Sequence, residues 1–222
     1  MPDTTPPPRV VVDGRGPVPD GIAALLRHLG VARVEAGGYA AAAAEAATDP
    51  AAHLGPERRP HLVVLTATPL VPAAAGRPWL ARGIPHLPIA CEHGRATLGP
   101  LVLPGHSACL TCQDLTRTDL DPRWAAAAAR AAAGPALSPA TVDAGALITP
   151  LVVALAGLVV AGWVDGAAPT AGVSTEVSLP WPTVVHRHWP VHPGCGCAEA
   201  AGAPAAMAPS AGTRGVQDTM AR

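Results

Sequence analysis

The chain has 222 residues, of which 49% are hydrophobic and 14% are charged, and its formal net charge is -1. This apolar content excludes a chain that is disordered throughout, and the near-zero charge gives no basis for steering to nucleic acid or to an anionic membrane surface. The length suffices for one domain with a substantial core or for two small ones.

The first part of the chain predicts a strand, a turn, a helix and a second strand. Residues 1–8 are polar and rich in Pro, and we expect them to form a disordered tail. Arg9–Asp13 (RVVVD) has the continuous β-branched pattern of a buried strand. After the turn DGRGPVPDG, Ile22–Gly30 has helical apolar spacing and ends on a glycine, and Val31–Glu35 predicts the second strand. This unit is typical of a doubly wound α/β sheet.

The pattern is weaker from Gly37 to Pro60, where the alanine run Ala40–Ala47 favours a helix by propensity alone. Clearer elements follow in the middle of the chain. They are a strand at His61–Thr66, a short helix at Trp79–Gly83, a strand at His86–Ala90 and extended chain over Arg95–Leu103.

The second half predicts a cysteine-bearing loop that enters a helix, two further helices and two strands. The helices cover Trp124–Ala133 and Asp143–Asp165, and the strands cover Val173–Leu179 and Pro182–His188. Residues 198–222 are of low complexity, and we expect a second disordered tail there.

The apolar segment Ala144–Val164 has the length of a membrane span, about 20 residues. It also contains Pro150 and many small residues, and it lacks Arg or aromatic anchors on both sides. A fully buried helix has the same composition. We favour the buried helix and expect no membrane association.

Four of the five cysteines form two close pairs, one CxxC and one CxC. The N-terminus has no signal peptide, so we expect a cytoplasmic protein, in which paired cysteines are more often metal ligands than disulfides. Tetrahedral zinc takes four thiolates at about 2.3 Å. We therefore predict one structural zinc ion, Zn²⁺, that closes a long loop. Its ligands are Cys109, Cys112, Cys195 and Cys197.

Two alternatives to zinc are a redox-active CxxC and inert buried thiols. A redox CxxC normally opens a helix after the first strand of its fold, and this one lies in mid-chain. His106 and His192 are reserve ligands. The fifth cysteine, Cys91, lies in the apolar strand pattern LPIAC and is expected in the core rather than as a nucleophile.

Two smaller features have an ordinary and a functional interpretation. The segment TRTDLDPRW is either a solvated charged turn or a partner-binding edge, because Arg and Trp anchor interfaces. His186, His188 and His192 recur with period two towards Cys195, and they either supplement the zinc or are exposed strand residues.

Five segments, in order, resemble the ThiF/MoeB superfamily, the adenylating fold shared with ubiquitin-activating enzymes. They are RVVVDGRGPVPDGIAALLRHLGVARVE, HLVVLTATP, GPLVLPGHSACLTC, DAGALITPLVVALAGLVVAGWVDG and VHRHWPVHPGCGC. The segment GPLVLPGHSACLTCQDLTRTDLDPRW is similar to ThiF-like proteins of azole-forming peptide modification, called cyclodehydratase partners or precursor-leader-binding proteins. The resemblance implies an α/β fold over residues 9–197. Its parts would be a degenerate, shortened Rossmann-like sheet, flanking helices and a C-terminal zinc-stapled part.

The phosphate-binding loop departs from the family pattern. Active members cradle ATP with a GxGGxG-type loop, and Gly14 and Gly16 are the vestige of it here. Pro17 and Pro19 stand where two further glycines are expected, and proline has no backbone N–H to donate to a phosphate. A plain tight turn explains the two glycines equally well.

The other nucleotide-binding groups are also reduced. After the second strand only Glu35 is available for ribose, and the family's Asn-Arg-Gln run is missing. Thr66 and Thr68 stand where an aspartate for magnesium is expected, and Arg15 is the loop's lone basic residue. We therefore expect no ATP binding and a catalytically degenerate protein.

Three functions remain open. The first is a non-catalytic scaffold that holds a peptide or protein partner, with a homodimer as one arrangement. The second is an active adenylyltransferase of a peptide or ubiquitin-like C-terminus. The third is a structural subunit of an azole cyclodehydratase, where the resemblance implies a YcaO-type enzyme or a precursor leader peptide as the partner. No nucleic acid partner is expected.

Overall fold

The computed structural model describes residues 7–49, 58–133, 142–167 and 171–200. The expected disordered tails therefore lie mostly outside the described residues. The short helix α7 (Cys197–Ala200) continues the fold past Cys197, where the second tail was expected to begin.

The first four strands form the parallel half of one sheet, in the spatial order β2-β1-β3-β4. Their bounds are β1 Arg9–Asp13, β2 Arg33–Ala36, β3 Leu62–Ala67 and β4 His86–Glu92. The predictions of strands at Arg9, His61 and His86 are confirmed within one or two residues, because runs of β-branched and leucine side chains pack well on a buried sheet.

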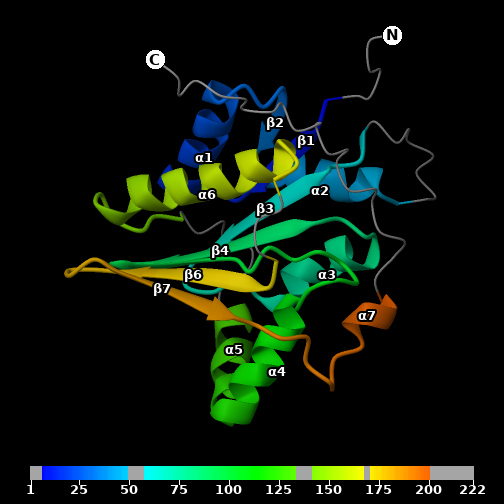
Figure 1. The fold of residues 1–222 in the computed structure, drawn as a ribbon, viewed down its shortest axis with the longest axis vertical. Coiled ribbons are helices and arrows are strands. Elements are labelled where there is room, and N and C mark those ends of the chain that lie inside the picture. Colours follow the sequence, from blue (N-terminus) through cyan, green and yellow to red (C-terminus); the bar gives the residue numbers. More distant parts are fainter. Residues whose placement is uncertain (1–6, 50–57, 134–141, 168–170, 201–222) are drawn as a thin grey trace, which may run out of the picture.

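The last three strands extend this sheet with antiparallel pairing to seven strands in all. They are β5 Arg95–Leu98, β6 Val173–Ser178 and β7 Thr183–His188. β7 is the last strand of the sheet among the described residues, and Figure 1 shows the β6–β7 hairpin along one side of the molecule.

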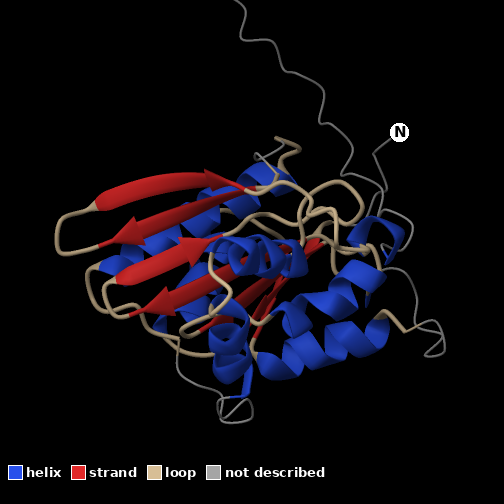
Figure 2. Ribbon diagram, turned by 90° about the horizontal axis from the view of Figure 1, so that it is seen from below, coloured by secondary structure: helices blue, strands red, loops and turns tan. Residues whose placement is uncertain are grey.

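Helices cover both faces of the sheet, as Figures 1 and 2 show. The helices α1 (Pro17–His28) and α6 (Ile148–Val164) pack together on one face. On the other face lie α2 (Gly38–Ala47), α3 (Ala73–Ala81) and α4 (Leu110–Leu120), with α5 (Trp124–Ala133) against α4. This α/β architecture agrees with the predicted fold class.

The alternation of side chains along β1 explains the two cores. Val10 and Val12 are fully buried in the cluster that contains α1 and α6, whereas Val11 is buried in the cluster that contains α2 and α3. Successive strand residues point to opposite faces of a sheet. A continuous apolar run therefore specifies a strand that is covered on both sides.

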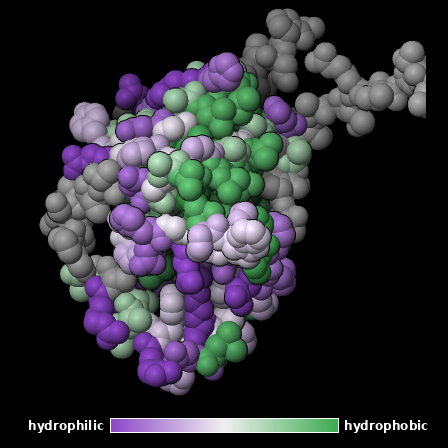
Figure 3. Space-filling view, turned by 90° about the vertical axis from the view of Figure 1, so that its left-hand side faces the viewer, coloured by the Kyte–Doolittle hydropathy of each residue, from purple (hydrophilic) through white to green (hydrophobic). Residues whose placement is uncertain are grey.

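Close packing of α6 against α1 depends on two glycines. A Cβ on Gly157 would lie 2.5 Å from Leu25 Cδ2, and one on Gly21 would lie 2.8 Å from Val153 Cγ2. The inner face of α6 is buried, in agreement with the helix prediction, and no described helix is long and apolar enough to cross a membrane. On its outer side, Leu147 is 81% exposed and Leu158 is 71% exposed. In Figure 3, apolar surface gathers at the height that α6 occupies in Figure 1.

Three predicted helix starts are wrong. The short helix predicted at Trp79–Gly83 is α3, which begins six residues earlier, at Ala73. α1 begins at Pro17, inside the segment predicted as a turn, because proline is well suited to the first turn of a helix, where its missing N–H has no intrahelical role. α6 begins at Ile148 rather than at Asp143. Gly145 has a positive φ of 88°, and its N–H donates to Asp143 Oδ1 at 2.8 Å, so this segment forms a turn before the helix.

Candidate metal centre and the loop after the first strand

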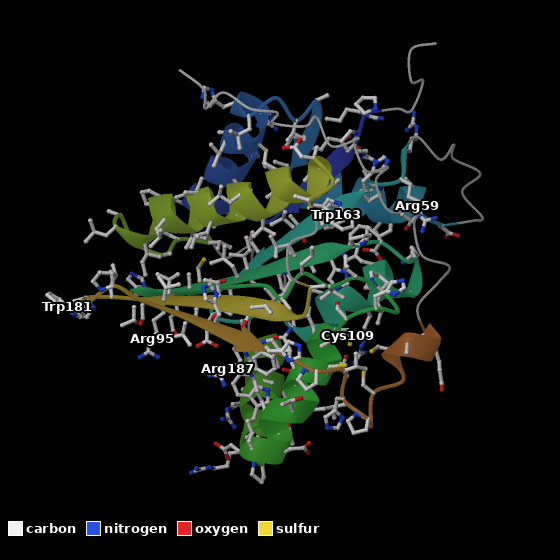
Figure 4. The ribbon with its side chains drawn as sticks, viewed as in Figure 1. Arg59, Arg95, Cys109, Trp163, Trp181 and Arg187 are labelled. Carbon is white, nitrogen blue, oxygen red and sulfur yellow. The ribbon has the colours of Figure 1, made fainter. Side chains whose placement is uncertain are left out.

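Four thiols from distant parts of the chain converge on one point. The sulfur of Cys109 lies 3.8 Å from that of Cys112 and 3.7 Å from that of Cys195, and the sulfurs of Cys112 and Cys197 lie 3.5 Å apart. All four sulfur atoms lie within 4.8 Å of one another. Figure 4 shows Cys109 with other sulfur atoms close by, between α4 and α7.

Two local structures present these thiols. Cys109 is the N-cap residue of α4 and Cys112 lies in its first turn, so both sulfurs face the same side of the helix start. Cys195 lies on a turn in which its N–H donates to the His192 carbonyl at 2.9 Å, and Cys197 begins α7. Val102, Ala108 and Trp189 pack around the cluster, in which Cys195 is only partly buried.

The thiols differ in their readiness to ionise. Burial opposes ionisation of Cys112, but peptide N–H groups of His192 and Cys109 and the neighbouring thiols outweigh it, so its pKa is lowered. Burial and hydrogen bonding by Cys112 raise the pKa of Cys195 to about 11 and also raise that of Cys197.

The geometry fits a tetrahedral metal ion. Four sulfurs at about 2.3 Å from a central zinc would be separated by about 3.8 Å. Three of the six sulfur–sulfur separations, 3.5 to 3.8 Å, are close to that edge length, and all of them are within 4.8 Å. An all-sulfur donor set favours a soft or borderline ion such as zinc.

The reserve histidine ligands lie outside this cluster. Among the described residues, the group of side chains that could hold a metal ion consists of the four cysteines alone. His192 accepts the Gly194 N–H at Nδ1 (3.0 Å) and contacts Asp119 Oδ2 through Nε2 (2.8 Å), so both ring nitrogens are engaged. His186 and His188 lie on the exposed strand β7, in agreement with the interpretation as exposed strand residues.

Cys91 is a core residue, as predicted. Its side chain is fully buried among the residues under α1 and α6. Burial raises the pKa of its thiol to about 11, which disfavours a nucleophilic thiolate.

The loop between β1 and α1 has no free donor at the start of the helix. Pro17 and Pro19 supply none, and the N–H between them, of Val18, donates to the Val142 carbonyl at 3.2 Å. Val142 in turn donates to the Arg15 carbonyl at 2.8 Å and is 2% exposed. The first turn of α1 is therefore closed by the chain segment that precedes α6.

Gly14 and Gly16 both have positive φ, of 112° and 114°, as the turn requires. The Thr66 hydroxyl donates to the Asp13 carbonyl at 2.7 Å and lies where a side chain on Gly14 would point. Burial raises the pKa of Asp13. The two glycines thus serve a tight turn packed against β3, and no described residue marks a phosphate position.

The acidic residue of β2 is also engaged. Both carboxylate oxygens of Glu35 accept hydrogen bonds from the Arg9 guanidinium, at 2.8 Å and 2.7 Å. This hydrogen bonding lowers the pKa of Glu35. The carboxylate is therefore committed to the β1–β2 pair rather than open to a ribose. Sequence reasoning missed both this pair and the role of Val142, since neither belongs to a motif.

No protein-family model and no curated protein matches the sequence. The fold, however, matches solved structures. The heterocyclase TruD is 20% identical with a TM-score of 0.57, over 86% of this chain and 27% of that chain. A heterocyclase solved with substrate and cofactor is 16% identical with a TM-score of 0.59, over 86% and 25%. E. coli MccB, solved with AMPCPP and MccA, is 14% identical with a TM-score of 0.55, over 86% and 66%.

The chain thus spans about a quarter of the heterocyclase chains and just under two thirds of MccB, as the covered shares of 27%, 25% and 66% state. At these identities the likeness concerns the fold. The chain has the α/β fold found in part of these heterocyclase chains and in MccB.

Proposed function

We propose that this chain is a zinc-stapled, non-catalytic ThiF-like protein that binds a peptide or protein partner in azole-forming peptide modification. The observation that carries the proposal is the closed first turn of α1, where two prolines and a hydrogen bond from Val18 to Val142 leave none of the first three helical residues with a free amide for a phosphate. Adenylation needs preorganised donors and a metal ion around a triphosphate. The engaged Glu35 carboxylate supports the same conclusion.

The metal would have a structural role. Cys109, Cys112, Cys195 and Cys197 would hold it, and four thiolates leave no open position for a substrate. Binding would link the start of α4 to the end of the described chain and thereby stabilise the fold.

The fold likeness supports a peptide partner. E. coli MccB was solved with MccA, and one heterocyclase was solved with its substrate. The matched heterocyclase chains are several times longer than the matched region. We therefore propose that this chain acts beside a separate YcaO-type cyclodehydratase or holds a precursor leader peptide.

The test of the non-catalytic role is a calorimetric titration with ATP and magnesium, together with pyrophosphate exchange in the presence of candidate peptides. We expect no binding and no exchange. A double variant, Pro17→Gly with Pro19→Gly, restores two backbone N–H groups and so tests whether the hydrogen bond from Val18 to Val142 is by itself enough to keep the turn closed to phosphate. ATP binding to the natural chain would sink the proposal and favour the adenylyltransferase.

Two further measurements test the remaining parts. Metal analysis of freshly purified, reduced protein should give about one zinc per chain, because two thiolate pairs make one closed site. A pull-down from the native host should recover a peptide-modifying enzyme or its precursor. Protein without metal would refute the zinc assignment, and recovery of unrelated partners would refute the pathway assignment.

A further inference from the structure

The segment TRTDLDPRW takes part in a stack of arginine and tryptophan side chains. The Arg117 guanidinium lies over the rings of Trp124 and Trp189, 4.6 Å and 4.7 Å from their centroids. Arg187, on β7, also lies over the Trp189 ring, at 5.6 Å. Because cation–π contacts use the face of a guanidinium, its N–H groups, which lie in its plane, remain available to acceptors.

Two acids, Asp114 and Glu176, act on the charge of Arg117, but their hydrogen bonds go to other side chains. Asp114 Oδ1 accepts the Trp124 Nε1–H at 3.1 Å, and Glu176 Oε1 accepts the Arg187 Nε–H at 3.3 Å. Within the described part of the chain, the Arg117 guanidinium has ring contacts but no hydrogen bond and no ion pair. A half-buried arginine that keeps its donors free favours an anionic ligand.

A second free donor lies one turn earlier on α4. Gln113 is 3% exposed, and its Nε2 has no hydrogen-bond partner. It lines, together with Arg117, a cavity of about 30 Å³ between α4 and strands β4 and β5. An unpaired buried amide is costly, so a group with acceptor oxygens is expected at this place.

On its other side Arg117 borders an open groove of about 260 Å³. The stack residues line it together with Leu120, Asp121 and Glu176. Beside this groove runs the free edge of β7, all of whose residues are exposed. Val185, which is 50% exposed, pairs with Glu176 and so shares the groove side of β7 with Arg187. Figure 4 shows Arg187 above α4 and α5.

The charge of this edge indicates its partner. β7 (TVVHRH) contains one arginine and two histidines and no acidic residue, while Arg187 pairs with Glu176 of β6 at 3.3 Å and Asp121 also lines the groove. An unpaired strand edge binds an extended chain through main-chain hydrogen bonds, and alternate side chains of that chain enter neighbouring pockets. A side chain of the bound chain that points to the groove side would contact the stack of Arg117, Trp124, Trp189 and Arg187.

We propose that the β7 edge binds an extended acidic peptide segment, which places a glutamate side chain against Arg117. Gln113 offers a further donor in the adjoining cavity. This inference rests on the proposed partner-binding function and names the chemistry of the partner. The zinc cluster would position the site, because Cys109 and Cys112 start α4, and Trp189 packs on the same thiols.

The probe is a soluble, Thr-rich peptide of about eight residues, a common strand length, with one central Glu. It is acetylated and C-terminally amidated, so that the side chain is its one carboxylate. Its partner peptide carries Gln instead. Fluorescence anisotropy gives the affinities, and amide chemical shifts of ¹⁵N-labelled protein locate the binding. We expect shifts along β7 and binding of the Glu peptide at least about tenfold tighter, since a charge-assisted bidentate pair is lost with Gln.

Two protein variants complete the test. Arg117→Gln should abolish the preference for Glu over Gln. Arg123→Gln should keep it, because this neighbouring side chain is 92% exposed and pairs with Asp121 alone among the described residues. Unchanged zinc content shows that α4 is intact in each variant. If Arg117→Gln disrupts α4, Gln113→Leu, which fills the cavity, takes its place in the test. A Glu peptide N-methylated at alternate amides should not bind.

Failure of the Glu peptide to bind, equal affinity for both peptides, or a preference that survives Arg117→Gln would overturn the acidic-peptide proposal. Self-association of the chain that Arg117→Gln abolishes would assign the edge to a second copy and would also overturn it. The proposed non-catalytic function fails on a different result, ATP binding. The two failures are therefore distinguishable.

Discussion

The two ends of this molecule differ in how their polar groups are paired. In the β1–α1 loop the polar groups that resemble a nucleotide site are satisfied from within, through Val18 to Val142, Thr66 to Asp13, and Arg9 to Glu35. Among the described residues around α4, the structure instead brings together four free thiols, and Gln113 Nε2 is buried without a partner there, as Arg9 Nη1 is at the other end.

This difference shows where ligands are expected. Buried polar groups in folded proteins are nearly always paired, so a loop that has lost its ligand is stabilised by replacing it with internal partners. In a site that still binds a ligand, polar groups converge on one point and have no hydrogen-bond partner within the protein itself. The convergence of four thiols, more than unpaired donors alone, therefore marks the α4 side as the place where a ligand is expected.

The largest expected effect comes from the thiol cluster. Cys195→Ser should lose the metal and lower the melting temperature by about 10 °C or more, because structural zinc contributes folding free energy directly. Zinc content and calorimetric melting measure both parts. Cys91→Ser is the control, since it also changes a buried thiol but should retain zinc and melt only a few degrees lower, in line with a cost of about 1–3 kcal/mol for a buried hydroxyl. Equal melting temperatures of the two variants would contradict the structural role.

An intermediate effect is expected at the closed loop. Gly14→Ala should destabilise the fold more than Gly37→Ala, by about 1–3 kcal/mol, although both glycines have positive φ. A Cβ on Gly14 collides with the Thr66 hydroxyl, whereas one on Gly37 meets no atom within 4 Å. Denaturant unfolding gives the two free energies. Adding Thr66→Ala to Gly14→Ala should recover part of the loss, and full additivity would show that the loop and β3 are not coupled.

The smallest expected effect concerns the Glu35 carboxylate, which is hydrogen-bonded to Arg9. Hydrogen bonding by Arg9 lowers the pKa of Glu35 from its usual 4.5, so its contribution to stability is present above that value and is lost as pH falls through the lowered pKa. Because Glu35 is 39% exposed, Glu35→Gln should cost only about 1 kcal/mol at neutral pH. Unfolding measured between neutral and acidic pH should show this cost vanish below the folded pKa. Glu92→Gln, on an exposed site, should show no such trend, and a pH-independent cost for Glu35→Gln would refute the assignment.

Much of the fold follows from local sequence. Strands such as Arg9–Asp13 and His86–Glu92 were predicted because their apolar runs are continuous, and only a strand between two helical layers buries both of its faces. The starts of α1 and α6 were predicted wrongly. The prolines of the first turn resemble a loop as much as a helix start, and an apolar run does not reveal that Gly145 adopts a positive φ before it.

The sequence by itself determined the spacing of the two cysteine pairs, CxxC and CxC, and the absence of a backbone N–H at Pro17 and Pro19. Only the tertiary structure decided that Val142 closes the loop, that Glu35 is committed to Arg9, and that Arg117 lies between two tryptophans while Gln113 stays unpaired. The reason is physical. Spacing along a chain fixes which residues share a turn, whereas pairing across elements depends on packing that brings distant segments to the same depth and register.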